Sequence, residues 1–117
     1  MGAIHLTYDQ HVAVVTIEDA ERYNAMSLSM WIVLGRAFEE IDQHPDTRVV
    51  ILRGAGERAF VSGANISEFD TQRNSDASVA HYNQSVAQAQ EAITRCRVPV
   101  IAAISGICYG GGLGLAL

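Results

Sequence analysis

The chain has 117 residues, of which 49% are hydrophobic, and a formal net charge of −5, which suits one modest globular unit or a piece of one. It contains no lysine: all eight basic residues are arginines, scattered among thirteen acidic residues. A Walker phosphate loop and Schiff-base catalysis both require a lysine, and a nucleic-acid-binding face requires clustered positive charge. The sequence therefore supports none of these functions and predicts no nucleic-acid partner.

The sequence also has no sign of a membrane span, a signal peptide or a metal-binding motif. No apolar run is long enough to span a bilayer, and the N-terminus runs straight into alternating apolar residues without the basic start and apolar block of a signal peptide. Cys96 and Cys108 are too few and too widely spaced for a disulfide framework or a zinc motif, so we expect reduced, packed thiols. These features predict a cytoplasmic location, no membrane partner and no metal.

The first part of the chain predicts two strands and a long helix. Residues 4–8 predict a short strand, and residues 11–17, which are rich in β-branched residues, predict a longer one. Ser27 is the expected N-cap of a helix that extends to about residue 43 and ends before Pro45. Its apolar residues recur at spacings of three and four, which predicts a buried face of Trp31, Leu34, Phe38 and Ile41.

The second part predicts two more strands and another helix. The unbroken apolar run at 49–52 predicts a buried strand, followed by a glycine-rich turn at 54–56. A helix is expected over 78–95 after a polar loop at 70–77, and a fully apolar strand over 98–104.

Small residues occur at two places where the chain should pass from a strand into a helix. Ser-Gly-Ala-Asn at 62–65 precedes one helix start, and Gly-Gly-Gly at 110–112 precedes another. The first N–H groups of a helix have no intrahelical partner and lie at the positive end of its dipole, so each junction can hold an anion or a partial negative charge. A thioester carbonyl that becomes an enolate is such a ligand.

Such segments have three other interpretations. A glycine-rich segment after a strand is most often only a turn. A dinucleotide-binding fingerprint fails because its third glycine would fall on Leu115 or Leu117. A nucleophile elbow fails because neither Ser62 nor Ser105 has glycines two residues away on both sides.

The motifs together resemble the N-terminal half of the enoyl-CoA hydratase/isomerase family, also called the crotonase family, over nearly the whole chain. Residues 22–26 resemble the loop that lies against coenzyme A, residues 49–52 with 60–66 the first oxyanion segment, and residues 99–112 the second. The resemblance implies an α/β fold, a spiral of β-β-α units of the ClpP/crotonase type, of which residues 1–117 form the N-terminal part of one domain. It also implies acyl-CoA substrates in fatty acid metabolism, no cofactor besides the substrate's own coenzyme A, and a homotrimer or hexamer at full length.

The resemblance assigns roles to particular residues. The backbone N–H groups of Ala64 and Gly111 are expected to form the oxyanion hole, as the catalytic groups. Asn65 stands where the family usually has aspartate, which removes a negative charge. The residues expected to contact the substrate are Arg22, Tyr23, Ala25, Ser62, Asn65, Ile66, Tyr109 and Gly114.

One departure from the family pattern limits the reaction that can be named. The first catalytic glutamate of family hydratases falls on Gly114, and the second would lie beyond Leu117. The segment thus supplies an oxyanion hole without either expected carboxylate. A hydratase (a lyase) or an isomerase is the expected enzyme, and an acyl-CoA hydrolase or decarboxylase, a non-catalytic acyl-CoA binder and an inactive fragment remain alternatives. We also expect the chain to be truncated within the helix that the three glycines begin.

Overall fold

Three β-β-α units follow one another in the computed structural model, which describes residues 2–63, 76–108 and 110–116. This order agrees with the repeating unit that the family resemblance implies. The first unit contains β1 (Ala3–Asp9), β2 (Val12–Glu18), a short 3₁₀ helix η1 (Ala20–Arg22) and α1 (Leu28–Asp42). The second contains β3 (Val49–Gly54), β4 (Ala59–Val61) and α3 (Asp76–Thr94), and the third contains β5 (Val100–Ala103), β6 (Ile107–Cys108) and α4 (Gly111–Ala116).

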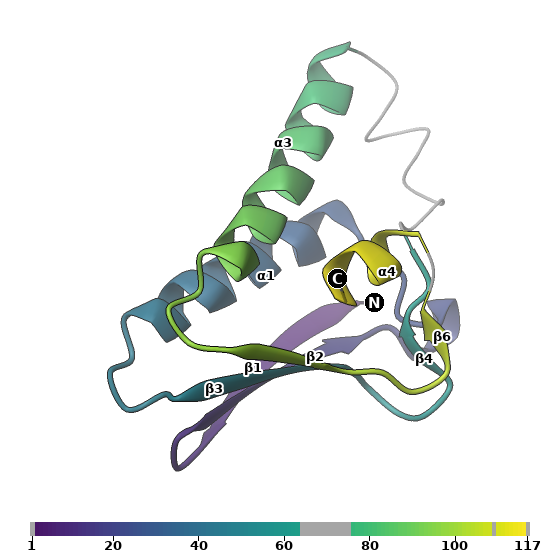
Figure 1. Cartoon of the computed structure of the whole chain (residues 1–117). Coiled ribbons are helices and arrows are strands. Elements are labelled where there is room, and N and C mark those ends of the chain that lie inside the picture. Colours follow the sequence, from purple (N-terminus) through teal and green to yellow (C-terminus); the bar gives the residue numbers. More distant parts are fainter. Residues whose placement is uncertain (1, 64–75, 109, 117) are drawn as a thin grey trace.

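The strands form two sheets. The larger sheet has the order β1-β2-β3-β5; β1 and β2 are antiparallel, whereas β3 pairs in parallel with both β2 and β5. Helices α1 and α3 lie on one face of this sheet and pack against each other (Figure 1). The smaller sheet consists of β4 and β6 alone, in parallel. It lies beside α4, which it contacts (Figure 1).

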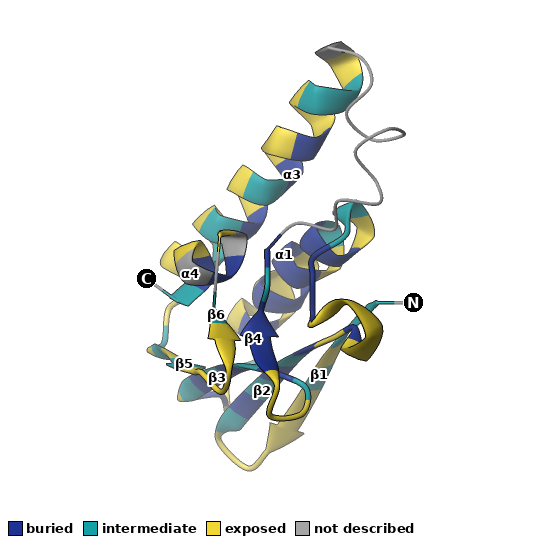
Figure 2. Ribbon diagram, turned by 90° about the vertical axis from the view of Figure 1, so that its right-hand side faces the viewer, coloured by how far each residue is buried: buried dark blue, intermediate teal, exposed yellow. Residues whose placement is uncertain are grey.

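The hydrophobic core lies between α1 and the larger sheet. The four apolar residues expected on α1 are all buried, and they pack in one cluster with Val15, Ile17 and Leu52 of the sheet. Ser27 caps the helix as expected, because its Oγ accepts a hydrogen bond from the Met30 N–H at 3.2 Å. Figure 2 shows this buried layer in dark blue between α1 and the strands.

Two of the expected strands are less buried than their apolar sequences suggest. In β3, Val50 and Leu52 are buried, whereas Val49 and Ile51 are only partly buried. In β5, Ile101 is 54% exposed. Side chains alternate between the two faces of a strand, so a strand is buried throughout only where both faces are covered. Among the described residues, α1 and α3 pack together on one face of the larger sheet, so the side chains on its other face are less covered.

The ends of several elements also differ from the expected ranges. The strand expected over 98–104 is limited to β5, because Pro99 has no N–H to donate and Gly106 turns the chain with a φ of 73°. Helix α3 begins at Asp76 rather than at residue 78. The rest of the loop expected over 70–77 lies outside the described residues.

No helix in the described part of the chain is both long and apolar enough to cross a membrane.

Candidate functional site

The pairing of β4 with β6 brings the two strand-to-helix junctions together. Ala59 lies opposite Ile107, and Val61 lies opposite Cys108, so the chain leaves both strands at the same end of this small sheet. A methyl group added to Gly110 would lie 3.8 Å from the Cα of Gly63. Two segments about fifty residues apart in sequence therefore lie next to each other at their glycines.

The triple glycine allows α4 to begin directly against β4. Gly110 has a φ of 53°, a left-handed conformation that glycine adopts without strain. A Cβ on Gly112 would overlap the carbonyl oxygen of Val61, so the two backbones touch at this point. Gly111 is the first residue of α4, so the helix begins within the three glycines rather than after them. The N–H of Gly111 is among those that a helix leaves unsatisfied.

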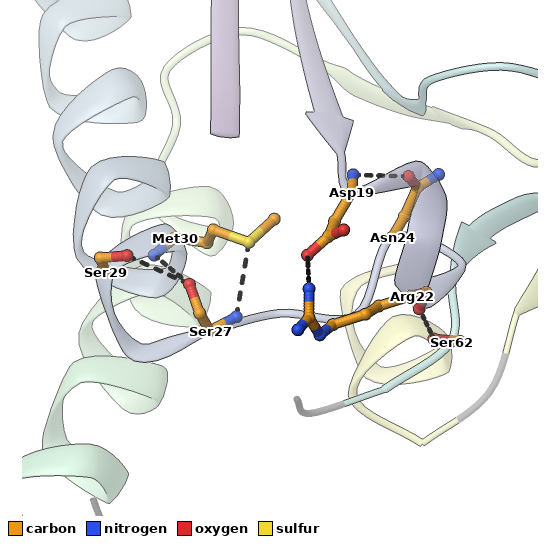
Figure 3. Close-up of polar contacts among 7 residues, drawn as sticks. All are labelled: Asp19, Arg22, Asn24, Ser27, Ser29, Met30 and Ser62. Atoms are coloured by element: carbon orange, nitrogen blue, oxygen red, sulfur yellow. Dashed lines mark hydrogen bonds and ion pairs between the residues drawn. The ribbon is translucent and has the colours of Figure 1, made fainter. Parts of the chain in front are cut away.

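The loop at 22–26 is hydrogen-bonded to the end of β4. The Met26 N–H donates to the carbonyl oxygen of Gly63 at 2.7 Å, and the Ser62 N–H donates to that of Tyr23 at 3.2 Å. The Ser62 hydroxyl donates to the carbonyl oxygen of Arg22 at 3.0 Å (Figure 3). The structure thus brings together four of the residues expected at the site: Arg22, Tyr23, Ala25 and Ser62.

Asn24 holds this loop in place, a role that its local sequence does not reveal. Its side chain is 2% exposed; its Oδ1 accepts from the Asp19 N–H at 2.9 Å (Figure 3). Its Nδ2 donates to the carbonyl oxygens of Ala59 at 2.8 Å and Ala55 at 3.2 Å. Tyr23 and Asn24 both have positive φ, and asparagine tolerates this conformation better than most residues. The position of Asn24 between a predicted strand and a capped helix was the only sequence feature that could have indicated this role.

The side chains of Arg22 and Tyr23 already have partners within the chain. The Arg22 guanidinium lies 3.7 Å from the buried carboxylate of Asp19 (Figure 3). Tyr23 is 41% exposed, and the Arg58 guanidinium lies 4.7 Å from its ring centre and donates a hydrogen bond to its hydroxyl at 2.8 Å. Arg58 is a second residue beside the loop that the sequence analysis did not identify. A cation stacked on an exposed aromatic ring is stabilised by the ring's negative face.

A cavity of about 630 Å³ lies between α3, β5 and α4, and we call it the α3–α4 cavity. Gly114 and Gln90 line it, together with Cys96. The pKa of the Cys96 thiol is raised, mainly because the thiol is partly buried. This thiol therefore stays protonated at neutral pH. Both cysteines are free and partly buried, as expected.

The remaining expected site residues cannot be placed. Ala64, Asn65, Ile66 and Tyr109 lie outside the described residues, so their roles stay predictions. In the described ranges, no group of three or more histidine, cysteine, aspartate or glutamate side chains is arranged to hold a metal ion.

Comparisons with known proteins agree with this arrangement. The family model described as enoyl-CoA hydratase/isomerase matches residues 7–117. A solved enoyl-CoA hydratase/carnithine racemase from Magnetospirillum magneticum is 45% identical, with a TM-score of 0.94, over 99% of this chain and 43% of that one.

Relatives with different reactions also match this chain. A peroxisomal Delta(3,5)-Delta(2,4)-dienoyl-CoA isomerase from Arabidopsis thaliana is 38% identical over 92% of this chain and 42% of its own length. An indene-carboxyl-CoA hydrolase from Rhodococcus jostii is 37% identical over 98% of this chain and 43% of its own length. The chain thus spans less than half the length of these relatives and has the fold of their matched part. It belongs to the enoyl-CoA hydratase/isomerase family.

Proposed function

We propose that the protein carrying this chain is an enzyme that acts on acyl-CoA thioesters and stabilises an enolate in a backbone oxyanion hole. The N–H groups of Ala64 and Gly111 donate to the thioester oxygen. The observation that carries the proposal is the parallel pairing of β4 with β6, which places Gly110 next to Gly63. Membership of the family supports the same assignment.

Backbone donors suit this chemistry because they are fixed before the substrate binds. When a proton leaves the carbon next to a thioester, negative charge moves to the carbonyl oxygen. Two N–H groups already aimed at that oxygen stabilise this charge without reorganisation, and each can contribute about a hundredfold or more to the rate. The glycines at 63 and 110–112 keep side chains away from the backbone there.

Gly114 limits the reactions that this part of the protein can catalyse alone. Glycine has no side chain that can transfer a proton, so any acid or base must come from elsewhere in the protein. Hydration or isomerisation of an enoyl-CoA is our first proposal, and hydrolysis is a second. A non-catalytic acyl-CoA binder is the alternative that Gly114 itself favours. By the family resemblance, we further propose a homotrimer or hexamer in the cytoplasm that takes part in fatty acid metabolism.

The proposal is tested by giving the protein, at its natural length, three kinds of acyl-CoA. Hydration consumes a 2-enoyl-CoA, isomerisation converts a 3-enoyl-CoA, and hydrolysis releases the free thiol of coenzyme A. We expect turnover of at least one class. Tight binding without turnover of any of the three would exclude these reactions and favour the non-catalytic alternative, and failure to bind any acyl-CoA would refute the proposal.

A further inference from the structure

Strand β1 lies at the edge of the larger sheet that is farthest from β5. Within the part of the chain that the structure describes, β1 pairs only with β2, and Figure 2 shows it at one end of the sheet. In such an edge strand, every second residue directs its N–H and C=O groups away from the sheet, where another strand can pair with them. The edge can therefore accept one more strand.

β1 lacks the features that usually prevent pairing between edge strands. Natural edge strands are commonly short, bulged, or protected by proline or lysine. β1 has seven residues with neither proline nor lysine, and its register with β2 is continuous from Ala3 to Asp9. Its one acidic residue, Asp9, is the last of the strand. This edge is therefore suited to bind a strand rather than to repel one.

A groove beside β1 provides space for the side chains of an added strand. A cavity of about 200 Å³ lies between β1 and α1. It is lined by Ile4, Leu6, Val33, Arg36, Ala37 and Glu40. Two apolar side chains near it are exposed, Val33 by 41% and Tyr8 by 36%, and the Tyr8 hydroxyl donates to Glu40 at 3.0 Å. Apolar side chains placed in this groove would be removed from water.

We propose that this edge binds β1 of a second copy of the chain, in an antiparallel pair across a two-fold axis beside Leu6. In this register Leu6 lies opposite Leu6 of the other copy, and Ile4 lies opposite Tyr8. Because side chains alternate along a strand, these residues share the face of β1 that is directed toward α1. On the other face, His5 lies opposite Thr7. Apolar residues thus meet largely apolar residues, and polar residues meet polar ones.

The charges on α1 favour a second copy as the occupant. Arg36 and Glu40 are exposed, lie one helical turn apart, and line the same groove as Leu6. A two-fold axis beside Leu6 reverses the direction of α1 in the other copy, so Arg36 of each copy lies on the side of Glu40 of the other. The surface is therefore complementary to itself in charge as well as in strand pairing. Such a contact doubles the assembly that the rest of the protein forms, whatever reaction the protein catalyses.

The mass of the assembly tests the contact. It is measured for the protein at its natural length by size-exclusion chromatography with light scattering. Thr7→Lys adds a charge to the exposed face of β1 next to the other copy, so it should halve the mass. Gln88→Lys adds the same charge at an exposed position of α3 and should leave the mass unchanged. An odd number of subunits in the unmodified protein, or an unchanged mass for Thr7→Lys, would overturn the proposal.

Disulfide trapping tests the register. Co-expressed His5→Cys and Thr7→Cys variants should form a disulfide-linked dimer in air, because directly opposite residues have Cβ atoms about 4.5–5.5 Å apart. Either variant alone should not, because its two new cysteines lie diagonally and too far apart to be bridged. Co-expressed His5→Cys and Asp9→Cys variants are the control for a shifted register. No cross-link in the first pair, or equal cross-linking in both pairs, would overturn the proposal.

Discussion

Replacing Gly112 with alanine should destabilise the protein by at least about 2 kcal/mol and lower acyl-CoA turnover by about a hundredfold or more. The added Cβ would overlap the Val61 carbonyl oxygen and would lie 2.8 Å from the Val61 Cβ. Because backbone, rather than a flexible side chain, occupies this place, α4 must move away from β4. That movement displaces the Gly111 N–H from the proposed oxyanion site.

The control for stability is Gly114→Ala in the same helix. Its Cβ would meet only the Gln90 amide, at an ordinary contact distance of 3.5 Å. Alanine favours a helix over glycine by up to about 1 kcal/mol, so this variant should unfold at the same or a higher urea concentration. If Gly112→Ala and Gly114→Ala have equal stability, the close contact between α4 and β4 does not exist as described.

Replacing Asn24 with alanine should cost about 3 kcal/mol of unfolding free energy. The change removes three side-chain hydrogen bonds, each contributing about 1 kcal/mol, and leaves backbone groups of Asp19, Ala55 and Ala59 with fewer partners. It also places alanine at a φ of 59°. Because Asn24 connects the loop at 22–26 to β4, acyl-CoA affinity should fall as well.

Urea unfolding of three variants tests this explanation. Asn24→Gly retains the backbone conformation but not the hydrogen bonds, so it should lie between the unmodified protein and Asn24→Ala. Asn83→Ala changes an exposed asparagine of α3 and should shift stability by no more than about 0.5 kcal/mol. A loss below about 1 kcal/mol for Asn24→Ala would contradict the structural role given to this residue.

The elements with a strong local pattern were predicted well from the sequence. The spacing of Trp31, Leu34, Phe38 and Ile41 identified the buried face of α1, and Ser27 identified its start. No strand was predicted at β4 or β6, because they have only three and two residues. Such short strands have no periodicity of their own, and their pairing depends on contacts between distant parts of the chain.

The candidate site was only partly predictable for the same reason. The small residues at 62–65 and 110–112 indicated two anion-binding junctions, but their contact arises from the pairing of β4 with β6. Asn24 and Arg58 were missed because their partners lie about thirty-five residues away in sequence. A buried asparagine has the same local sequence pattern as an asparagine in an exposed turn.

The most direct test of the oxyanion site is a crystal structure of the protein, at its natural length, with a bound acyl-CoA. We expect the thioester carbonyl oxygen within about 2.7–3.1 Å of the backbone nitrogens of both Ala64 and Gly111. The β4–β6 pair should hold the two donors on either side of that oxygen. A thioester oxygen bound by side chains, or by neither of these nitrogens, would contradict the account.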